Sequence, residues 1–231
     1  RWMGMGGSGM ETASAGATAG GATPRGPQTK QGGSDYVGIV LWPPPKKKVD
    51  IVPPRPNEPL LGRGVGSKPL VIPFDGPYWY FKAPMTGPGP KAHVMFGKST
   101  EAKVRSTNWM PLRMEAHQNL GLPIDLDCCR EIDVTVTNAD VGAGRIDVSL
   151  VLTDTDSPGR RAVLLGDQPV VSSQGAPGKT PVTETLKFAI PRTSSGLTRR
   201  FNEINVVIQP PVERARSGSR IAVEEFELVP R

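Results

Sequence analysis

Apolar and polar side chains alternate with a period of two in several segments of this chain. Residues 131–137 place Ile132, Val134 and Val136 on one face of an extended backbone, with polar residues between them. Residues 145–152 repeat the pattern. This alternation is typical of β-strands that have one buried face and one solvent face. The chain is therefore expected to form sheets.

Further strands are expected on both sides of this pair. Residues 183–190 and 201–208 alternate in the same way, and prolines follow each of them. Proline has no backbone N–H to donate to a sheet, so it ends a strand. Shorter β-prone runs at residues 70–72 and 78–81 are separated by a turn sequence. Five or more strands at this spacing predict an antiparallel β-sandwich.

The last strand, over residues 220–229, changes phase along its length. Ile221 and Val223 share one face, whereas Phe226 and Leu228 have the opposite parity. One extra residue near Glu224–Glu225 would return all four apolar side chains to the same face. We therefore expect a β-bulge at this point.

Composition agrees with an all-β fold. Glycine and proline account for 27 and 25 of the 231 residues, and at this density they interrupt helices. The longest apolar run, residues 37–42, is far shorter than the ~18 residues that a membrane-spanning helix requires. The predicted fold class is thus all-β, an antiparallel β-sandwich preceded by a disordered arm rich in Gly and Pro.

Composition also divides the chain into three segments. Residues 1–35 hold ten glycines and predict a flexible leader. Residues 36–67 are rich in Pro and Lys and predict an extended linker. Residues 68–231 carry the alternating segments and are expected to form the sandwich domain. Because the chain begins with Arg1, we expect it to be a piece of a longer polypeptide, tethered to a membrane segment outside it.

The positive charge of the chain lies mainly before the predicted domain. Residues 1–100 carry 12 Lys and Arg against 5 Asp and Glu, whereas the remainder carries 16 against 17. A nucleic-acid-binding domain is expected to carry a basic face on the fold itself, so no nucleic-acid partner is predicted. The run Lys46–Lys48 is interpreted as a solvated linker, or alternatively as a contact with an anionic membrane or cell-wall polymer.

Three of the late segments together resemble a known family. They are residues 184–191 (Glu-Thr-Leu-Lys-Phe-Ala-Ile-Pro), 201–208 (Phe-Asn-Glu-Ile-Asn-Val-Val-Ile) and 221–228 (Ile-Ala-Val-Glu-Glu-Phe-Glu-Leu). Following an Asp-rich strand entry at residues 124–127, this order resembles the galactose-binding-like jelly roll of many carbohydrate-binding modules. The resemblance covers about residues 68–231. It implies a jelly-roll sandwich, a glycan ligand bound by exposed aromatic side chains and, in many relatives, one structural calcium ion.

Two other blocks, residues 73–81 and 114–121, are similar to the C-terminal, extracytoplasmic part of uncharacterised bacterial membrane proteins. This resemblance implies a membrane-associated protein of the bacterial cell envelope, located outside the cytoplasm. It implies no particular activity.

A block of four aromatic residues is the clearest candidate for ligand contact. In an extended strand Trp79 and Phe81 share one face, while Tyr78 and Tyr80 share the other. We assign Trp79 and Phe81 to the core, because a tyrosine hydroxyl can remain solvated. The alternative is that the whole block is a hydrophobic plug at the edge of the core. The candidate ligand-binding residues are Tyr78, Tyr80, Trp109 and His117.

No motif in the sequence predicts catalysis. His93 and His117 are the two histidines, and His117 shares a face with Glu115 if this segment is extended. Neither a Gly-x-Ser-x-Gly elbow nor a phosphate-binding or zinc-protease motif occurs. We therefore predict no catalytic residue, although Asp133 and Asp147 on neighbouring strands would be paired carboxylates if they were close.

Metal and cofactor binding are weakly indicated. Asp154 and Asp156 lie in an Asp-x-Asp loop that could contribute oxygen ligands to calcium. The same sequence, Asp-Thr-Asp-Ser-Pro-Gly, is equally suited to a hairpin turn. No cofactor other than a structural calcium ion is predicted.

The two cysteines, Cys128 and Cys129, are adjacent. A bond between neighbours is strained, because their Cα atoms lie closer together than in most disulfides. As strand neighbours they would point to opposite faces, so we expect one to be buried and the other exposed. An intermolecular disulfide and a vicinal redox pair are the alternatives.

These observations favour a non-enzymatic β-sandwich module that binds a glycan or a protein outside the cytoplasm. One alternative is a hydrolase with a site built from loops of the sandwich. Another is a structural assembly subunit whose Pro-rich arm pairs with the sheet edge of a neighbour. A groove with convergent carboxylates would favour the hydrolase, and an aromatic-lined face would favour binding.

Overall fold

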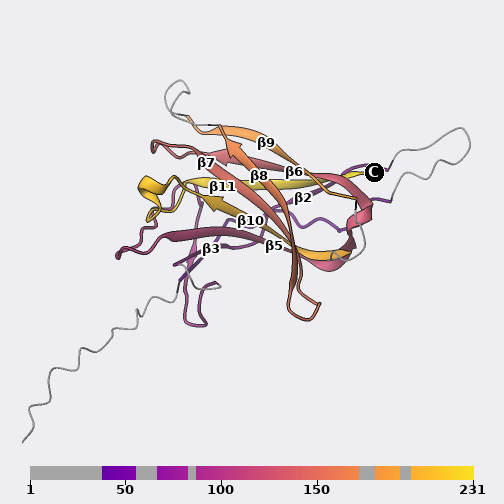
Figure 1. Cartoon of the computed structure of the whole chain (residues 1–231), viewed down its shortest axis with the longest axis horizontal. Coiled ribbons are helices and arrows are strands. Elements are labelled where there is room, and N and C mark those ends of the chain that lie inside the picture. Colours follow the sequence, from indigo (N-terminus) through magenta and orange to yellow (C-terminus); the bar gives the residue numbers. More distant parts are fainter. Residues whose placement is uncertain (1–37, 56–66, 83–86, 172–179, 193–198) are drawn as a thin grey trace, which may run out of the picture. The chain divides into compact units, whose positions relative to one another are not determined.

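The computed structural model describes residues 38–55, 67–82, 87–171, 180–192 and 199–231. All of them fall within one compact unit, Tyr36–Arg231. They form two mostly antiparallel sheets that pack as a sandwich (Figure 1). The predicted all-β fold class is therefore confirmed. The leader predicted over residues 1–35 lies outside the described residues.

The larger sheet has seven strands. Every neighbouring pair is antiparallel except β4 and β1, which run parallel at one edge. In spatial order the strands are β4 (His93–Phe96), β1 (Ile39–Trp42), β3 (Tyr78–Lys82), β5 (Leu112–Asp125), β10 (Arg200–Gln209), β7 (Ile146–Asp154) and β8 (Arg161–Val170).

The smaller sheet has four antiparallel strands, in the order β2 (Leu70–Pro73), β11 (Ile221–Pro230), β6 (Cys129–Asn138) and β9 (Val182–Ala189). Two short 3-10 turns, η1 (Leu126–Cys128) and η4 (Val212–Arg214), connect strands. No helix within the described ranges is long and apolar enough to cross a membrane.

The core lies between the two sheets and contains the apolar residues that the alternation marks. In β6, for example, Ile132, Val134 and Val136 are completely buried. The same holds, to within 6% exposure, for the predicted inward positions of β7, β9 and β10. These positions are Ile146, Val148, Leu150, Leu152, Leu186, Phe188, Ile204, Val206 and Ile208.

The predicted bulge in the last strand is confirmed. The pairing of β11 with β6 shifts register between Val223 and Glu225. As a result Ile221, Val223, Phe226 and Leu228 are all buried. The extra residue thus returns the apolar side chains to the core.

The predicted orientation of the aromatic block is wrong for Tyr78, Trp79 and Tyr80, whereas Phe81 is buried as predicted, at 2% exposure. Tyr78 and Tyr80 are 1% exposed and belong to the core, whereas Trp79 lies on the opposite face and is half-buried. The Tyr78 hydroxyl accepts a hydrogen bond from the backbone N–H of Val223 at 2.8 Å. The bulge in β11 therefore supplies a polar partner inside the core, and burial raises the pKa of Tyr78.

Several strands of the structure are not predicted from the sequence. Strand β1 lies within residues 36–67, where a linker is expected, and pairs with β3. Strand β4 has four exposed residues and no alternation. Strand β5 is long, but its polar residues Glu115, His117 and Gln118 are buried along with its apolar ones, which hides the two-residue period.

The expectation of one buried and one exposed cysteine is also wrong. Cys128 and Cys129 form a disulfide with each other, and both are buried in the core. Cys128 ends the 3-10 turn η1 and Cys129 begins β6. The rule that neighbours point to opposite faces applies within a strand, so it does not hold across this junction.

Candidate functional site

A pocket of about 700 Å³ opens beside β1, β3 and β5, on the face of the seven-stranded sheet that is turned away from the core. The segment that follows β1 forms one wall. The residues that line the pocket are Trp42, Pro43, Pro45, Lys46, Lys48, Asp75, Gly76, Pro77, Trp79, Phe96, His117, Gln118, Asn119 and Glu203. They come from parts of the chain that are up to 161 positions apart in sequence.

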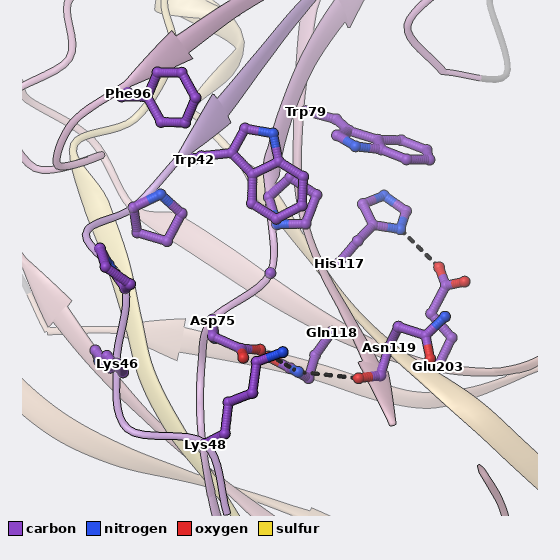
Figure 2. Close-up of a pocket in the computed structure, with 14 residues that line it drawn as sticks. Trp42, Lys46, Lys48, Asp75, Trp79, Phe96, His117, Gln118, Asn119 and Glu203 are labelled. Carbon is purple, nitrogen blue, oxygen red and sulfur yellow. Dashed lines mark hydrogen bonds and ion pairs between the residues drawn. The ribbon is translucent and has the colours of Figure 1, made fainter. Parts of the chain in front are cut away.

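Aromatic side chains form one side of this pocket (Figure 2). Trp42 and Phe96 are paired neighbours on β1 and β4. Trp42 is 38% exposed and Phe96 is 81% exposed. Trp79, from β3, is half-buried. The pocket therefore offers large apolar rings that a ligand can contact directly.

Hydrogen-bonding groups form the other side. The Gln118 amide donates to Asp75 Oδ1 at 2.8 Å and accepts from the Asp75 backbone N–H at 3.0 Å. Asn119 is exposed at the same rim, and Lys48 is exposed on the segment after β1. Figure 2 shows these side chains opposite the aromatic ones. A ligand with several hydroxyl groups would find both donors and acceptors here.

The segment after β1 is anchored to the smaller sheet by a lysine. Lys46 Nζ lies 2.9 Å from Glu224 Oε2 and donates to the Glu224 carbonyl oxygen at 2.8 Å. Lys46 therefore does not behave as the solvated linker residue that the sequence suggests. Lys47 and Lys48 are exposed.

One of the residues that line the pocket is His117, whose imidazole lies between two carboxylate groups. His117 Nδ1 lies 2.8 Å from Glu203 Oε1, and His117 Nε2 lies 2.9 Å from Glu115 Oε2. All three side chains are only about 10% exposed. Trp79 stacks on the imidazole ring, with ring centroids 3.7 Å apart and an interplanar angle of 27°. The His117 cluster, meaning Glu115, His117 and Glu203, thus fixes the position of the Trp79 ring.

Two arginines extend this cluster into a row of alternating charge. Arg113 forms an ion pair with Glu115, and Arg160 Nη2 lies 3.4 Å from Glu203 Oε2. Strands β5 and β10 are neighbours, which is why Glu203 comes close to His117. Each carboxylate therefore lies between the His117 imidazole and an arginine.

Burial and pairing shift the pKa values of the His117 cluster in opposite directions. Burial by itself would lower the pKa of His117, but the hydrogen bonds and charges of Glu115 and Glu203 outweigh it and raise that pKa. Burial would raise the pKa of both carboxyl groups. The hydrogen bond to His117 and the nearby arginine outweigh burial in each case, so the pKa of Glu115 and that of Glu203 are lowered.

Neither carboxyl group of the His117 cluster has the raised pKa of a general acid. Glycoside hydrolysis needs one carboxyl group that stays protonated near neutral pH, whereas the pKa of each of these two carboxyl groups is lowered. Among the described residues that line the pocket there is no Ser, Thr or Cys nucleophile. The pocket lining combines aromatic faces with polar groups.

The structure does not bring the four predicted ligand-binding residues together. His117 lies in the pocket. Tyr78 and Tyr80 are core residues, so the proposed tyrosine stacking surface is wrong. Trp109 is 88% exposed with the Arg216 guanidinium 5.1 Å from its ring, and it does not line this pocket.

The calcium candidates sit in a turn. Asp154 Oδ1 accepts from the backbone N–H of Asp156 at 3.1 Å, as in an Asx-turn. In the described part of the chain no group of three or more His, Cys, Asp or Glu side chains is placed to hold a metal ion. The sequence also suggested Asp133 and Asp147 as paired carboxylates on neighbouring strands. They lie in different sheets, because Asp133 is on β6 in the small sheet and Asp147 is on β7 in the large one.

Sequence reasoning missed Trp42, Asp75, Phe96, Asn119 and Glu203. Trp42 ends the apolar run at residues 37–42, and that run was a usable signal. The others depend on strand pairing between distant segments, which a single sequence does not reveal.

The fold is a β-sandwich, and one of its sheets carries a pocket lined by aromatic and polar side chains. Comparisons with protein-family models, with curated proteins and with solved structures found no match for this chain.

Proposed function

We propose that this chain is a non-catalytic glycan-binding module. The observation that carries the proposal is the pairing of Trp42, Phe96 and Trp79 with Asp75 and Asn119 around one pocket. A sugar ring has an apolar face that packs on an aromatic ring and an edge of hydroxyl groups that exchange hydrogen bonds. Each half of the pocket matches one of these surfaces.

The fixed position of Trp79 supports the same proposal. Its ring is stacked on His117, which Glu115 and Glu203 hold from both sides. A ring that is already immobilised loses little conformational entropy when a ligand packs on it. The pocket is therefore preorganised for stacking rather than for proton transfer.

The proposal includes a location outside the cytoplasm, in the bacterial cell envelope. The Cys128–Cys129 disulfide supports it, because disulfides persist mainly in oxidising compartments. On this proposal the sandwich is a galactose-binding-like jelly roll, and the residues before it tether the domain to a membrane segment. The Gly-rich composition of residues 1–35 supports a tether of this kind.

Replacing Trp42 by alanine tests the glycan proposal. Because Trp42 is partly exposed at the pocket, we expect the fold to remain intact and glycan affinity to fall at least about tenfold, or about 1.4 kcal/mol. Affinity electrophoresis against a panel of cell-wall and plant polysaccharides measures the effect, with circular dichroism to confirm folding.

Trp109→Ala is the matched control, since it removes the same side chain at an exposed site outside the pocket. It should bind like the unmodified chain. Retention of binding by Trp42→Ala, or an equal loss in both variants, would reject the pocket as the glycan site.

A further inference from the structure

Strand β4 ends the seven-stranded sheet at its β1 side. Within the described ranges, β4 pairs with β1 and with no strand on its other side. All four of its residues are exposed. An edge strand of this kind presents unpaired backbone groups to which another chain can add a strand.

Backbone direction shows which groups face the open edge. The N–H groups of His93 and Gly97 point toward β1, donating to Gly38 at 3.0 Å and to Trp42 at 2.9 Å. Successive residues of a strand turn their N–H and C=O groups to opposite sides. The N–H and C=O groups of Val94 and Phe96 therefore face away from β1.

The other sheet edges are protected in ways that β4 is not. In β8 the positive φ of Gly166 accompanies a register shift, and Pro169 removes a donor. Strand β2 follows Pro69 and ends at Pro73. Strand β9 carries Glu184 and Lys187 among its eight residues. Bulges, prolines and charged side chains commonly prevent an edge strand from pairing with another chain.

Three of the four side chains of β4 are apolar as well as exposed, the exception being His93. Val94 is 58% exposed, Met95 is 44% exposed and Phe96 is 81% exposed. They project alternately to the two faces of the sheet. A strand added beside β4 would cover apolar surface on both faces.

Charge distinguishes between the partners that could add this strand. Lys91 and Lys98 flank β4, and no acidic residue lies between them. A second copy paired antiparallel through Val94 and Phe96 would place another strand flanked by Lys91 and Lys98 beside β4, and that strand supplies no acidic residue between its two lysines. The Lys98–Glu101 pair is 62% and 69% exposed, so it leaves Lys98 open to a competing carboxylate.

We propose that the open edge of β4 binds an extended peptide segment of a partner protein, with an apolar centre and acidic residues at its ends. The peptide forms backbone hydrogen bonds with Val94 and Phe96 and places its carboxylates near Lys91 and Lys98. The glycan proposal uses the Phe96 side chain in the pocket, whereas this site uses the outward backbone groups of Val94 and Phe96, so the two sites adjoin at Phe96.

The test uses a blocked synthetic heptapeptide, Asp-Val-Thr-Val-Thr-Val-Asp, titrated into the chain and followed by backbone amide NMR. We expect the largest shifts at Val94 and Phe96, and amide protection of both against hydrogen exchange. A lysine-flanked peptide of the same core should bind at least about tenfold more weakly. A peptide N-methylated at alternate residues on its bonding edge should not bind.

Val94→Pro provides the complementary protein variant. It removes an outward N–H, leaves the β1-facing bonds of β4 in place, and should abolish peptide binding. Val52→Pro, at another exposed valine, is the matched control and should bind normally. Absence of binding at millimolar peptide, equal binding of the N-methylated or lysine-flanked peptide, or shifts located away from β4 would each overturn the proposal.

Discussion

Replacing Tyr78 by alanine will lower the free energy of unfolding by about 3–5 kcal/mol. The side chain is 1% exposed, and its ring centroid lies 4.9 Å from that of Phe74 in the core. Truncation opens a cavity and also removes the hydrogen-bond acceptor for the Val223 N–H in the bulge of β11. Chemical denaturation monitored by fluorescence measures the change.

Two further variants separate the loss of ring packing from the loss of the hydrogen bond and test the inward orientation of Tyr78. Tyr78→Phe keeps the ring and should cost about 1–3 kcal/mol, because it leaves the Val223 N–H buried without its acceptor. Trp79→Ala removes a half-buried ring from the outer face and should cost less than Tyr78→Ala. If Trp79→Ala proved the more destabilising change, the inward orientation of Tyr78 would be contradicted.

Replacing His117 by alanine is expected to cost about 3–5 kcal/mol at neutral pH. The imidazole bridges two carboxylates that are about 90% buried. Without it, Glu115 and Glu203 face each other with only Arg113 and Arg160 to balance them. The double variant His117→Ala with Glu203→Gln removes one of these charges and should recover part of the loss. No recovery would mean that the cost comes from lost packing alone.

The stabilisation by His117 also depends on pH. Because its folded-state pKa is raised, the stabilisation is complete below the ordinary value of 6.5 and is lost as pH rises through the folded-state pKa. The pKa values of Glu115 and Glu203 are lowered, so their contribution is present above 4.5 and is lost as pH falls through their folded-state values. The stability difference between the unmodified chain and His117→Gln should therefore be largest between pH 4.5 and 6.5. A difference that stays constant to pH 9 would contradict the charged clamp.

The alternation of apolar residues was sufficient to predict the sandwich and much of its core. In β6, β7, β9 and β10 the core-facing side chains are apolar and the opposite ones mostly polar, so period two identifies the buried face. The bulge near Glu224 was predictable for the same reason. The apolar positions of the last strand change from odd to even numbers, and one extra residue returns them all to the same face.

The direction of the aromatic block was not predictable from its own residues. Tyr78 and Tyr80 point inward because β11 offers a backbone N–H to the Tyr78 hydroxyl, and because Trp79 finds His117 on the other face. Both partners lie in distant segments. A local rule that keeps tyrosine hydroxyls in water therefore gave the wrong face.

The pocket was only partly predictable for a related reason. His117 was a candidate from its residue type, but its partner Glu203 is 86 positions away and reaches it through the pairing of β10 with β5. Trp42 and Phe96 meet through the parallel pair at the sheet edge. No pattern in a single sequence specifies such pairings.

The most direct test of the glycan proposal is to observe the tryptophan side chains during a titration. The chain has four tryptophans, at positions 2, 42, 79 and 109, whose indole N–H signals can be assigned with Trp→Phe variants. Titration with an oligosaccharide from a retained polysaccharide should shift the signals of Trp42 and Trp79 and leave that of Trp109 unchanged. Shifts of Trp109 with no change at Trp42 and Trp79 would contradict the assignment of glycan binding to this pocket.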